Sequence, residues 1–228
     1  MSHPAKLSVL IAILFGCSSD SATEIEIESL VKAGRSLAEE HRYAEARNAY
    51  EKALAIDPLD AETHYELGNL NARLGRLDEA VQAYTASVTT DSTHDSARHN
   101  LAVVEADRGR LPRAVELLEQ LPEHAPALTT LALFYIKQGR YDLAEKTLQS
   151  VLGMDAEHLE VRQQLGQLFL RQGRYAEARL ELHRALELDS KQAESRRLLG
   201  LSYLAEKRFD EALIAFRQVV EHAPYLIE

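Results

Sequence analysis

The nine histidines make metal binding the first chemistry to consider in this sequence. His94, His124 and His158 recur along the chain, and each directly precedes a segment in which apolar residues have helical spacing. This recurrence predicts that the three histidines lie on successive loops. The ligands of one ion must instead converge on a point. We therefore predict no metal site.

Other kinds of chemistry find no support in the sequence either. It has no glycine-rich phosphate loop, no H-E-x-x-H motif, no recognisable Ser-His-Asp arrangement and only one cysteine. A net charge of −10 and a pI near 5.4 argue against nucleic-acid binding, which requires a basic surface. We predict a protein that is not an enzyme and that has no cofactor.

Alanines at a nearly fixed interval mark the elements that would carry any binding surface. They are separated by 34, 34, 30, 34 and 34 residues and stand at Ala46, Ala80, Ala114, Ala144, Ala178 and Ala212. Around the fifth of them, Leu165, Leu168 and Phe169 form one apolar helical face, and Leu182 belongs to a second face beyond Gly173. The pattern predicts two amphipathic helices joined by a tight turn, repeated along the chain.

This period and pattern resemble the tetratricopeptide repeat, a helix-turn-helix unit of about 34 residues. The resemblance implies an all-α fold, a right-handed α-solenoid of six repeats. The repeats are expected at 27–60, 61–94, 95–124, 125–158, 159–192 and 193–226, followed by a tail at 227–228.

Small and bulky residues alternate between the two helices of each repeat. The small residues lie on the first helix, where they would let the two helices approach closely: Gly34, Gly68, Ala102, Ala132, Gly166 and Gly200. The bulky residues follow the repeating alanines by one helical turn: Tyr50, Tyr84, Leu118, Leu148, Leu182 and Phe216.

The turns between the helices share a glycine followed by an arginine. Gly75, Gly109, Gly139 and Gly173 can adopt the positive φ that ends a helix. His41 and Lys207 replace glycine in the outer repeats, which predicts turns that are slightly strained or differently closed there. The arginines recur in all six turns, at Arg42, Arg76, Arg110, Arg140, Arg174 and Arg208, and we interpret them as turn-forming residues.

Two irregularities set the middle repeats apart. An aromatic position on the first helix becomes polar at Asn71 and Glu105, which predicts that the second and third repeats are the softest. The third repeat is also four residues short and contains Pro122, which disfavours a helix at Leu121. We predict a bend or a loosened contact near residues 120–126.

The family resemblance also implies a concave groove, lined by first-helix residues, that binds a protein or peptide partner. Carried over to this chain, the first repeat contributes Val31 and Arg35. The other predicted groove residues are Tyr65, Asn69, Arg73, His99, Asn100, Val103, Thr129, Leu133, Ile136, Gln163, Gln167, Leu170, Arg197, Leu201 and Leu204.

The first 16 residues do not fit the repeat pattern. Lys6 is followed by a short, mostly apolar stretch from Leu7 to Phe15, which is too short to span a bilayer but typical of a signal peptide. The segment Leu14 to Cys17 resembles the bacterial lipobox, which implies a lipid on Cys17. Phe15 departs from the usual small residue, and an ordinary secretory signal is the alternative.

Residues 17–26 would then form a lipidated cysteine and a polar tether. Ser18 follows the cysteine, where aspartate would favour retention in the inner membrane. The resemblance therefore implies a bacterial envelope protein, in the outer membrane facing the periplasm rather than in the inner membrane. The architecture is similar in outline to the lipoproteins that assist assembly of type IV pilus secretins.

We thus expect a membrane-anchored scaffold or adaptor that helps to assemble an envelope complex such as a pilus or a secretion machine. The alternative is a soluble repeat module that regulates an enzyme, for example a cell-wall hydrolase, or that oligomerises through its last helix. Leu213, Ile214 and Val220 would give that helix an apolar outer face. A tail folded over this face would be a structural explanation for it.

Overall fold

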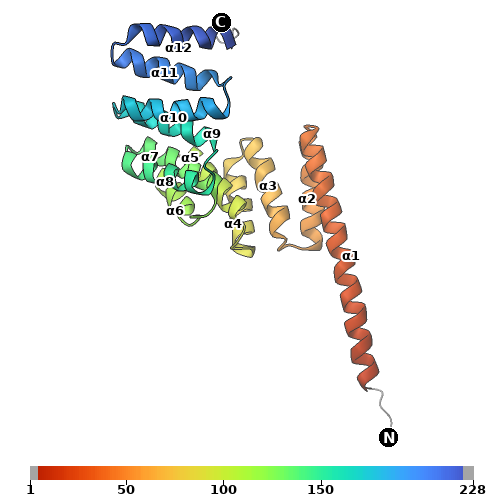
Figure 1. Cartoon of the computed structure of the whole chain (residues 1–228). Coiled ribbons are helices and arrows are strands. Elements are labelled where there is room, and N and C mark those ends of the chain that lie inside the picture. The colour runs from red at the N-terminus through yellow and green to blue at the C-terminus, as the bar shows by residue number, and fades with distance from the viewer. Residues whose placement is uncertain (1–4, 223–228) are drawn as a thin grey trace. The chain divides into compact units, whose positions relative to one another are not determined.

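The computed structural model describes the backbone of residues 5–222 and the side chains of residues 21–221. Within that range the chain forms twelve helices and no strand (Figure 1). In chain order they are α1 Ala5–Glu39, α2 Tyr43–Ile56, α3 Ala61–Arg73, α4 Leu77–Thr90, α5 Asp95–Asp107, α6 Leu111–Leu118, α7 Ala125–Lys137, α8 Tyr141–Met154, α9 Leu159–Arg171, α10 Tyr175–Leu188, α11 Ala193–Ala205 and α12 Phe209–His222. The all-α repeat predicted from the sequence is confirmed.

The chain divides into two compact units, residues 1–117 and residues 118–228. We call them the N-terminal and C-terminal units and describe each by itself. The division falls within α6, which has eight residues where the second helices of the other repeats have 14. It lies just before the segment 120–126, where the sequence predicts a loosened contact.

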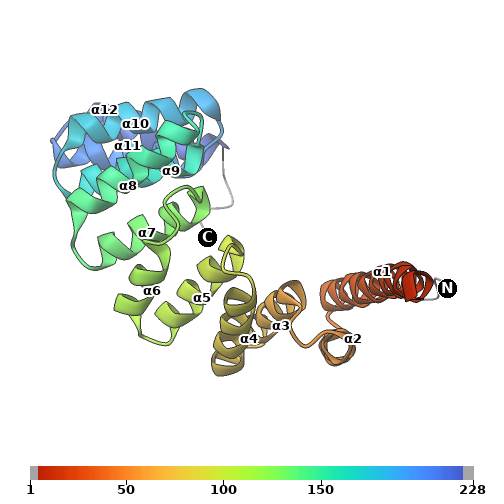
Figure 2. The ribbon, with the colours of Figure 1, turned by 90° about the horizontal axis from the view of Figure 1, so that it is seen from below.

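Helix α1 is much longer than the first helix of any other repeat, with 35 residues against 13 (Figures 1 and 2). Its first part includes residues 17–26, so the backbone of the expected polar tether is helical and continuous with the first repeat. The side chain of Cys17 and the tail at 227–228 lie outside the described residues.

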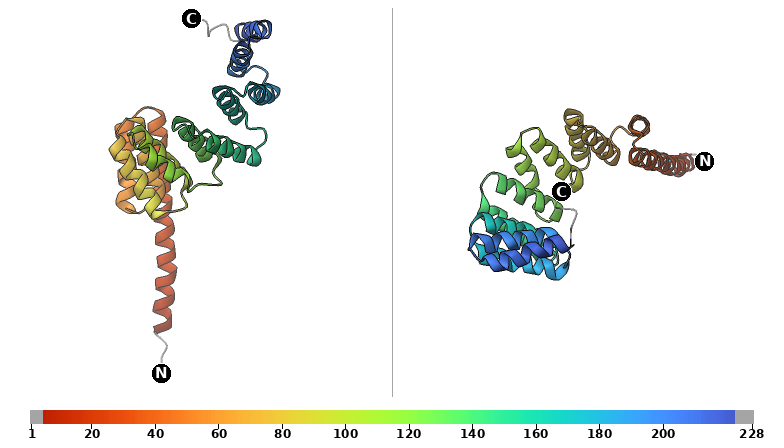
Figure 3. Two further views of the ribbon diagram at one scale, coloured as in Figure 1. Left: turned by 90° about the vertical axis from the view of Figure 1, so that its left-hand side faces the viewer. Right: turned by 90° about the horizontal axis from the view of Figure 1, so that it is seen from above.

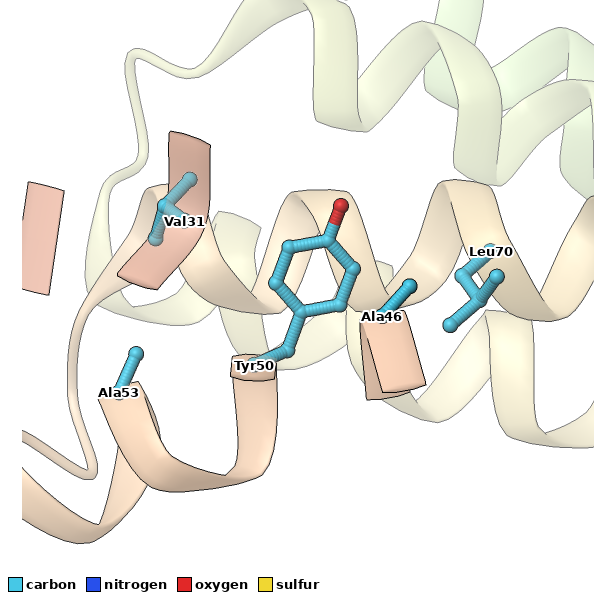
Figure 4. Packing of buried hydrophobic residues seen from close by; sticks show 5 residues of the cluster. All are labelled: Val31, Ala46, Tyr50, Ala53 and Leu70. Atoms are coloured by element: carbon cyan, nitrogen blue, oxygen red, sulfur yellow. The ribbon is translucent and has the colours of Figure 1, made fainter. Parts of the chain in front are cut away.

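The core of the N-terminal unit is built on the alternation of small and bulky residues. Tyr50 of α2 is almost fully buried, and its ring lies between Val31 on one side and Ala46 and Leu70 on the other (Figure 4). A Cβ atom added at Gly34 would lie only 2.4 Å from Cε1 of this ring. The glycine is therefore required by the bulky side chain that packs on it.

The same contact recurs in both units. Gly68 faces Tyr84 in the N-terminal unit, whereas Gly166 faces Leu182 and Gly200 faces Phe216 in the C-terminal unit. The sequence predicted small residues for close helix approach. The structure adds which residue packs against the small one: it is the bulky residue one turn beyond the repeating alanine.

The six turns are closed in the same way by the main chain. In each, the backbone N–H of the turn arginine donates to the carbonyl five residues earlier, at 2.8 or 2.9 Å. The residue before the arginine has positive φ, and this includes His41 at 62° and Lys207 at 60°. The two strained turns predicted from the sequence are confirmed, because left-handed backbone is unfavourable for residues other than glycine.

In three of the six turns, the arginine side chain also contacts the aromatic ring five residues before it. In the C-terminal unit the guanidinium groups of Arg140 and Arg174 lie 4.6 and 4.2 Å from the ring centres of Tyr135 and Phe169. Cation–π contact therefore links each turn to the helix before it. The two blue helices α11 and α12 lie side by side in both views of Figure 3. In the turn between them, the guanidinium group of Arg208 makes a cation–π contact with the ring of Tyr203.

Asn71 and Glu105 occupy the position of these rings in the second and third repeats. Both side chains are buried and both have partners: Asn71 accepts a hydrogen bond from Arg47, and Glu105 pairs with Arg108 and Arg110 at 3.4 Å. These bonds offset the cost of burying a polar group. Whether the two repeats are the softest stays a prediction.

Candidate functional site

The first helix of each repeat carries the residues predicted to form a groove, and most of them reach the surface. Leu133, Leu201 and Leu204 are exposed apolar side chains, at 44%, 37% and 45%. Arg73, Gln167 and Arg197 are exposed polar residues. The remaining predicted residues other than Thr129 are partly exposed: Tyr65, Asn69, His99, Asn100, Val103, Ile136, Gln163 and Leu170.

Two of the predicted groove residues, Val31 and Thr129, are buried. Val31 is 5% exposed and belongs to the core of the first repeat. Thr129 is 8% exposed, and its hydroxyl donates to the carbonyl of Ala125 at 2.9 Å. A threonine hydroxyl can bond to the carbonyl four residues earlier in its own helix. Whether Val31 and Thr129 contact a partner stays a prediction.

In the N-terminal unit, α3 and α5 bring four of the predicted residues together in a cleft of about 410 Å³. These residues are Asn69, Arg73, Asn100 and Val103. The same cleft is lined by Glu66, Ala72, Leu77, Tyr84, Val104 and Asp107.

A chain of hydrogen bonds fixes the polar side of this cleft. The Tyr84 hydroxyl and the Asn100 amide both donate to Oδ1 of Asn69, at 2.7 and 2.9 Å, and Asn69 in turn donates to Glu66 at 3.3 Å. Burial raises the pKa of Tyr84, so its hydroxyl stays neutral and keeps its proton to donate. The amides here are satisfied by the protein itself.

The charged residues beside this cleft are also paired internally. Arg35 donates to Glu66 at 2.6 Å and contacts Glu62, while Arg73 donates to the carbonyl of Ala38 at 3.2 Å. A smaller cleft of about 190 Å³ lies between these arginines. Arg35 and Arg73 are therefore both engaged by groups of the N-terminal unit itself.

His94 caps α5 and joins this network. Its Nδ1 accepts from the backbone N–H of Ala97 at 3.3 Å, so the neutral ring carries its proton on Nε2 and donates to Glu62 at 3.3 Å. The ring centre lies 4.7 Å from that of Tyr65. This histidine has a structural role, as does His124, whose Nδ1 accepts from Ala127 at 3.1 Å.

In the C-terminal unit, α9 and α11 form a cleft of about 330 Å³ that gathers Gln167, Leu170, Arg197 and Leu201 from the prediction. The lining is completed by Arg171, Tyr175, Leu198 and Ala205. Gln163 lies outside this lining. Its side chain links α9 to the start of α11, since it donates to Gln192 at 3.1 Å and to Ser195 at 2.9 Å.

Sequence reasoning missed several residues of these clefts. Tyr84 was assigned to the core alone, yet its hydroxyl reaches the cleft. Glu66 and Leu198 occupy the same position in different repeats, one turn before predicted groove residues. Helical spacing from Asn69 and Leu201 could have found both, because residues three apart share a face.

The described residues contain no candidate metal site, since no three histidine, cysteine or acidic side chains among residues 21–221 are placed to share an ion. Across residues 5–222, no helix combines the length and the apolar character needed to cross a bilayer. The linings of the two clefts present apolar, amide and guanidinium groups.

Comparison with known proteins supports this interpretation of the fold. Tetratricopeptide repeat models match residues 31–95, 72–129, 105–168, 135–202 and 169–225. No curated protein sequence matches the chain.

Three solved structures show the similarity of fold. PilF of Pseudomonas aeruginosa has a TM-score of 0.74 at 18% identity, covering 90% of this chain and 95% of PilF. PilW, described as a widely conserved type IV pilus biogenesis factor, has a TM-score of 0.75 at 16% identity, covering 87% and 94%. YrrB, described as having an unusual peptide-binding site, has a TM-score of 0.63 at 21% identity, covering 78% and 93%.

Repeat models that together span residues 31–225, and twelve helices paired at the expected interval, lead to one assignment. This chain belongs to the tetratricopeptide repeat family.

Proposed function

We propose that this protein is a non-enzymatic scaffold that binds a segment of a partner protein on its first-helix face. The observation that carries the proposal is the cleft of the C-terminal unit, where four residues from α9 and α11 converge beside exposed leucine. Apolar side chains open to solvent next to amide and guanidinium groups suit a peptide, with the apolar groups giving affinity and the polar groups giving orientation.

Site-specific crosslinking in cells tests this proposal. A photoreactive amino acid at Leu201 should crosslink to a discrete partner, because this side chain is 37% exposed in the cleft. The matched control is Leu180 of α10, which is 51% exposed but does not line the cleft. Equal crosslinking from both positions, or none from Leu201, would contradict the proposal.

We further propose that the scaffold is held in the bacterial envelope by a lipid on Cys17, in the outer membrane facing the periplasm. Support comes from the lipobox-like segment, from Ser18 after the cysteine, and from the likeness of fold to PilF and PilW. A role in assembling an envelope complex such as a pilus or a secretion machine follows from this location.

Metabolic labelling with a palmitate analogue tests the anchor. The wild-type chain should incorporate label and fractionate with the outer membrane, whereas Cys17→Ala should do neither. The control is Ser18→Asp, which should keep the label but move the protein toward the inner membrane. Label retained by Cys17→Ala would refute the anchor.

A second candidate function is self-association through α12. Leu213, Ile214 and Val220 are exposed at 49%, 56% and 48%, which is the apolar outer face expected from the sequence. Light scattering of the wild type and of the double variant Leu213→Glu, Ile214→Glu decides the matter. A larger mass for the wild type alone supports self-association, and a monomeric mass for both rules it out.

A further inference from the structure

The clefts of the two units occupy corresponding faces but differ in charge. Asn100 and Asp107 of α5, which line the first cleft, have their counterparts three repeats later in Leu198 and Ala205 of α11, which line the second. An amide has thus been replaced by a leucine, and a carboxylate by an alanine. The cleft of the C-terminal unit is lined by two arginines and by no acidic side chain, although the chain as a whole has a net charge of −10.

One of the two arginines has an internal partner, and the other has none among the residues that the structure describes. Arg197 is bound to Glu194 through two hydrogen bonds of 2.7 Å. Arg171, in the last turn of α9, is exposed and makes no ion pair with any residue that the structure describes. The corresponding residue of α3, Arg73, is engaged with the carbonyl of Ala38. Arg171 is therefore the cation of this cleft that remains free for a ligand.

The floor of the cleft is apolar and continuous with the core. Leu198 is 3% exposed and packs with Leu182 and Leu199, and Leu170 is partly buried against the same cluster. Leu201 stands at the edge with more than a third of its surface exposed. An apolar side chain entering here would cover leucine surface that now faces water, and such burial is the main source of affinity at small contacts.

We propose that the cleft of the C-terminal unit binds a segment in which a large apolar residue adjoins an aspartate or a glutamate. The apolar side chain lies on Leu170, Leu198 and Leu201, and the carboxylate pairs with Arg171. Arg197 adds positive potential from the opposite helix. This inference rests on the proposed scaffold function and specifies the chemistry of the partner.

We assign the carboxylate to a side chain of the bound segment, since the proposed scaffold binds a segment within a partner chain. Free backbone N–H groups arranged in a nest are one way of capturing a terminal carboxylate. Seven of the eight lining residues lie within α9 and α11, where helical hydrogen bonds already use the backbone, and the other is Tyr175 at the start of α10. The lining therefore presents side-chain donors.

A peptide-display selection on the purified full-length chain tests the proposal. The library contains random peptides flanked on both sides by Gly-Ser, so that no terminus is free. We expect enrichment of sequences in which Leu, Ile or Phe adjoins Asp or Glu. Synthetic versions of the enriched peptides are then measured by fluorescence anisotropy, with amidated and with free C-termini.

Arg171→Glu should weaken the binding of these peptides at least about tenfold, since it replaces an attraction with a repulsion. Arg217→Glu is the matched control, because it makes the same charge change at an exposed arginine of α12 outside the cleft, and it should leave the affinity within about twofold. Leu201→Glu should abolish binding.

The outcomes separate the inference from the scaffold function. Enriched peptides that lack acidic residues, or whose affinity is equally insensitive to Arg171→Glu and Arg217→Glu, refute the inference and leave the scaffold in place. A strong requirement for a free C-terminus also refutes it. No enriched peptide at all counts against both.

Discussion

The contact between Gly68 and Tyr84 gives the sharpest test of how these repeats are packed. A Cβ atom at Gly68 would lie 2.5 Å from Cδ1 and 2.6 Å from Cε1 of the tyrosine ring, where carbon atoms normally remain about 3.5 Å apart. The ring is 2% exposed and its hydroxyl is held by Asn69 at 2.7 Å, so it has little room to move. We expect Gly68→Ala to destabilise the N-terminal unit.

The magnitude follows from two opposed effects. Overpacking a core typically costs about 1–3 kcal/mol, and a rigid ring places this site near the upper limit. Replacing glycine by alanine inside a helix returns about 1 kcal/mol. The free energy of unfolding should therefore fall by about 2 kcal/mol, measured by urea denaturation followed by circular dichroism. Hydrogen exchange should show the loss in α3 and α4 first.

Two variants complete the test. Gly153→Ala in α8 has no atom within 4 Å of the new Cβ, so it should stabilise the protein by up to about 1 kcal/mol. The third and fourth repeats combine alanine at the small position with leucine at the bulky one, so Tyr84→Leu should relieve part of the cost of Gly68→Ala. A Gly68→Ala variant as stable as the wild type would refute the reasoning.

Three further measurements address other features. Lys207→Gly should stabilise its turn by about 1 kcal/mol because φ is 60° there, and Gly75→Ala, at 69°, should cost a similar amount; equal midpoints in urea would contradict this. Asp60→Ala should cost about 1 kcal/mol, since its carboxylate accepts from the N–H of Thr63 at 2.6 Å at the start of α3, and an unchanged thermal midpoint would exclude the cap. Burial raises the pKa of Tyr50 to about 12, so the folded state holds a proton that the unfolded chain releases near pH 10. Stability should fall between pH 10 and 12, and Tyr50→Phe should reduce that slope in denaturation curves.

The regular part of the fold could be predicted because the same pattern of small and bulky residues occurs in all six repeats. The repeating alanines are buried in every repeat, and the positive φ expected at His41 and Lys207 is found. Repetition made these predictions secure, because a chance match at one repeat does not recur at the next. The length of α1 was not predicted, since short polar and acidic residues such as those of 18–26 suit a tether as well as a helix.

The candidate site was predictable in outline but not in detail. Helical spacing identified the exposed face, yet it could not show that Asn69 and Asn100 bind each other while Arg171 binds nothing the structure describes. These differences depend on which side chains meet between repeats, about 30 residues apart in sequence, and such pairing has no local signature. Thr129 differs from these residues, because its partner is the carbonyl of Ala125, one turn away in the same helix, and helical spacing alone does not show that bond.

Because α1 is one continuous helix, it fixes the orientation of the first repeat relative to the beginning of that helix. A helix turns by about 100° and advances about 1.5 Å for each residue, so residues 18–26 form a stiff helical segment whose length sets the rotation of the first repeat. Adding one residue to this segment would rotate α2 and α3 by about 100° relative to any structure that holds the beginning of α1. A flexible linker would accommodate the same insertion without changing the orientation of α2 and α3.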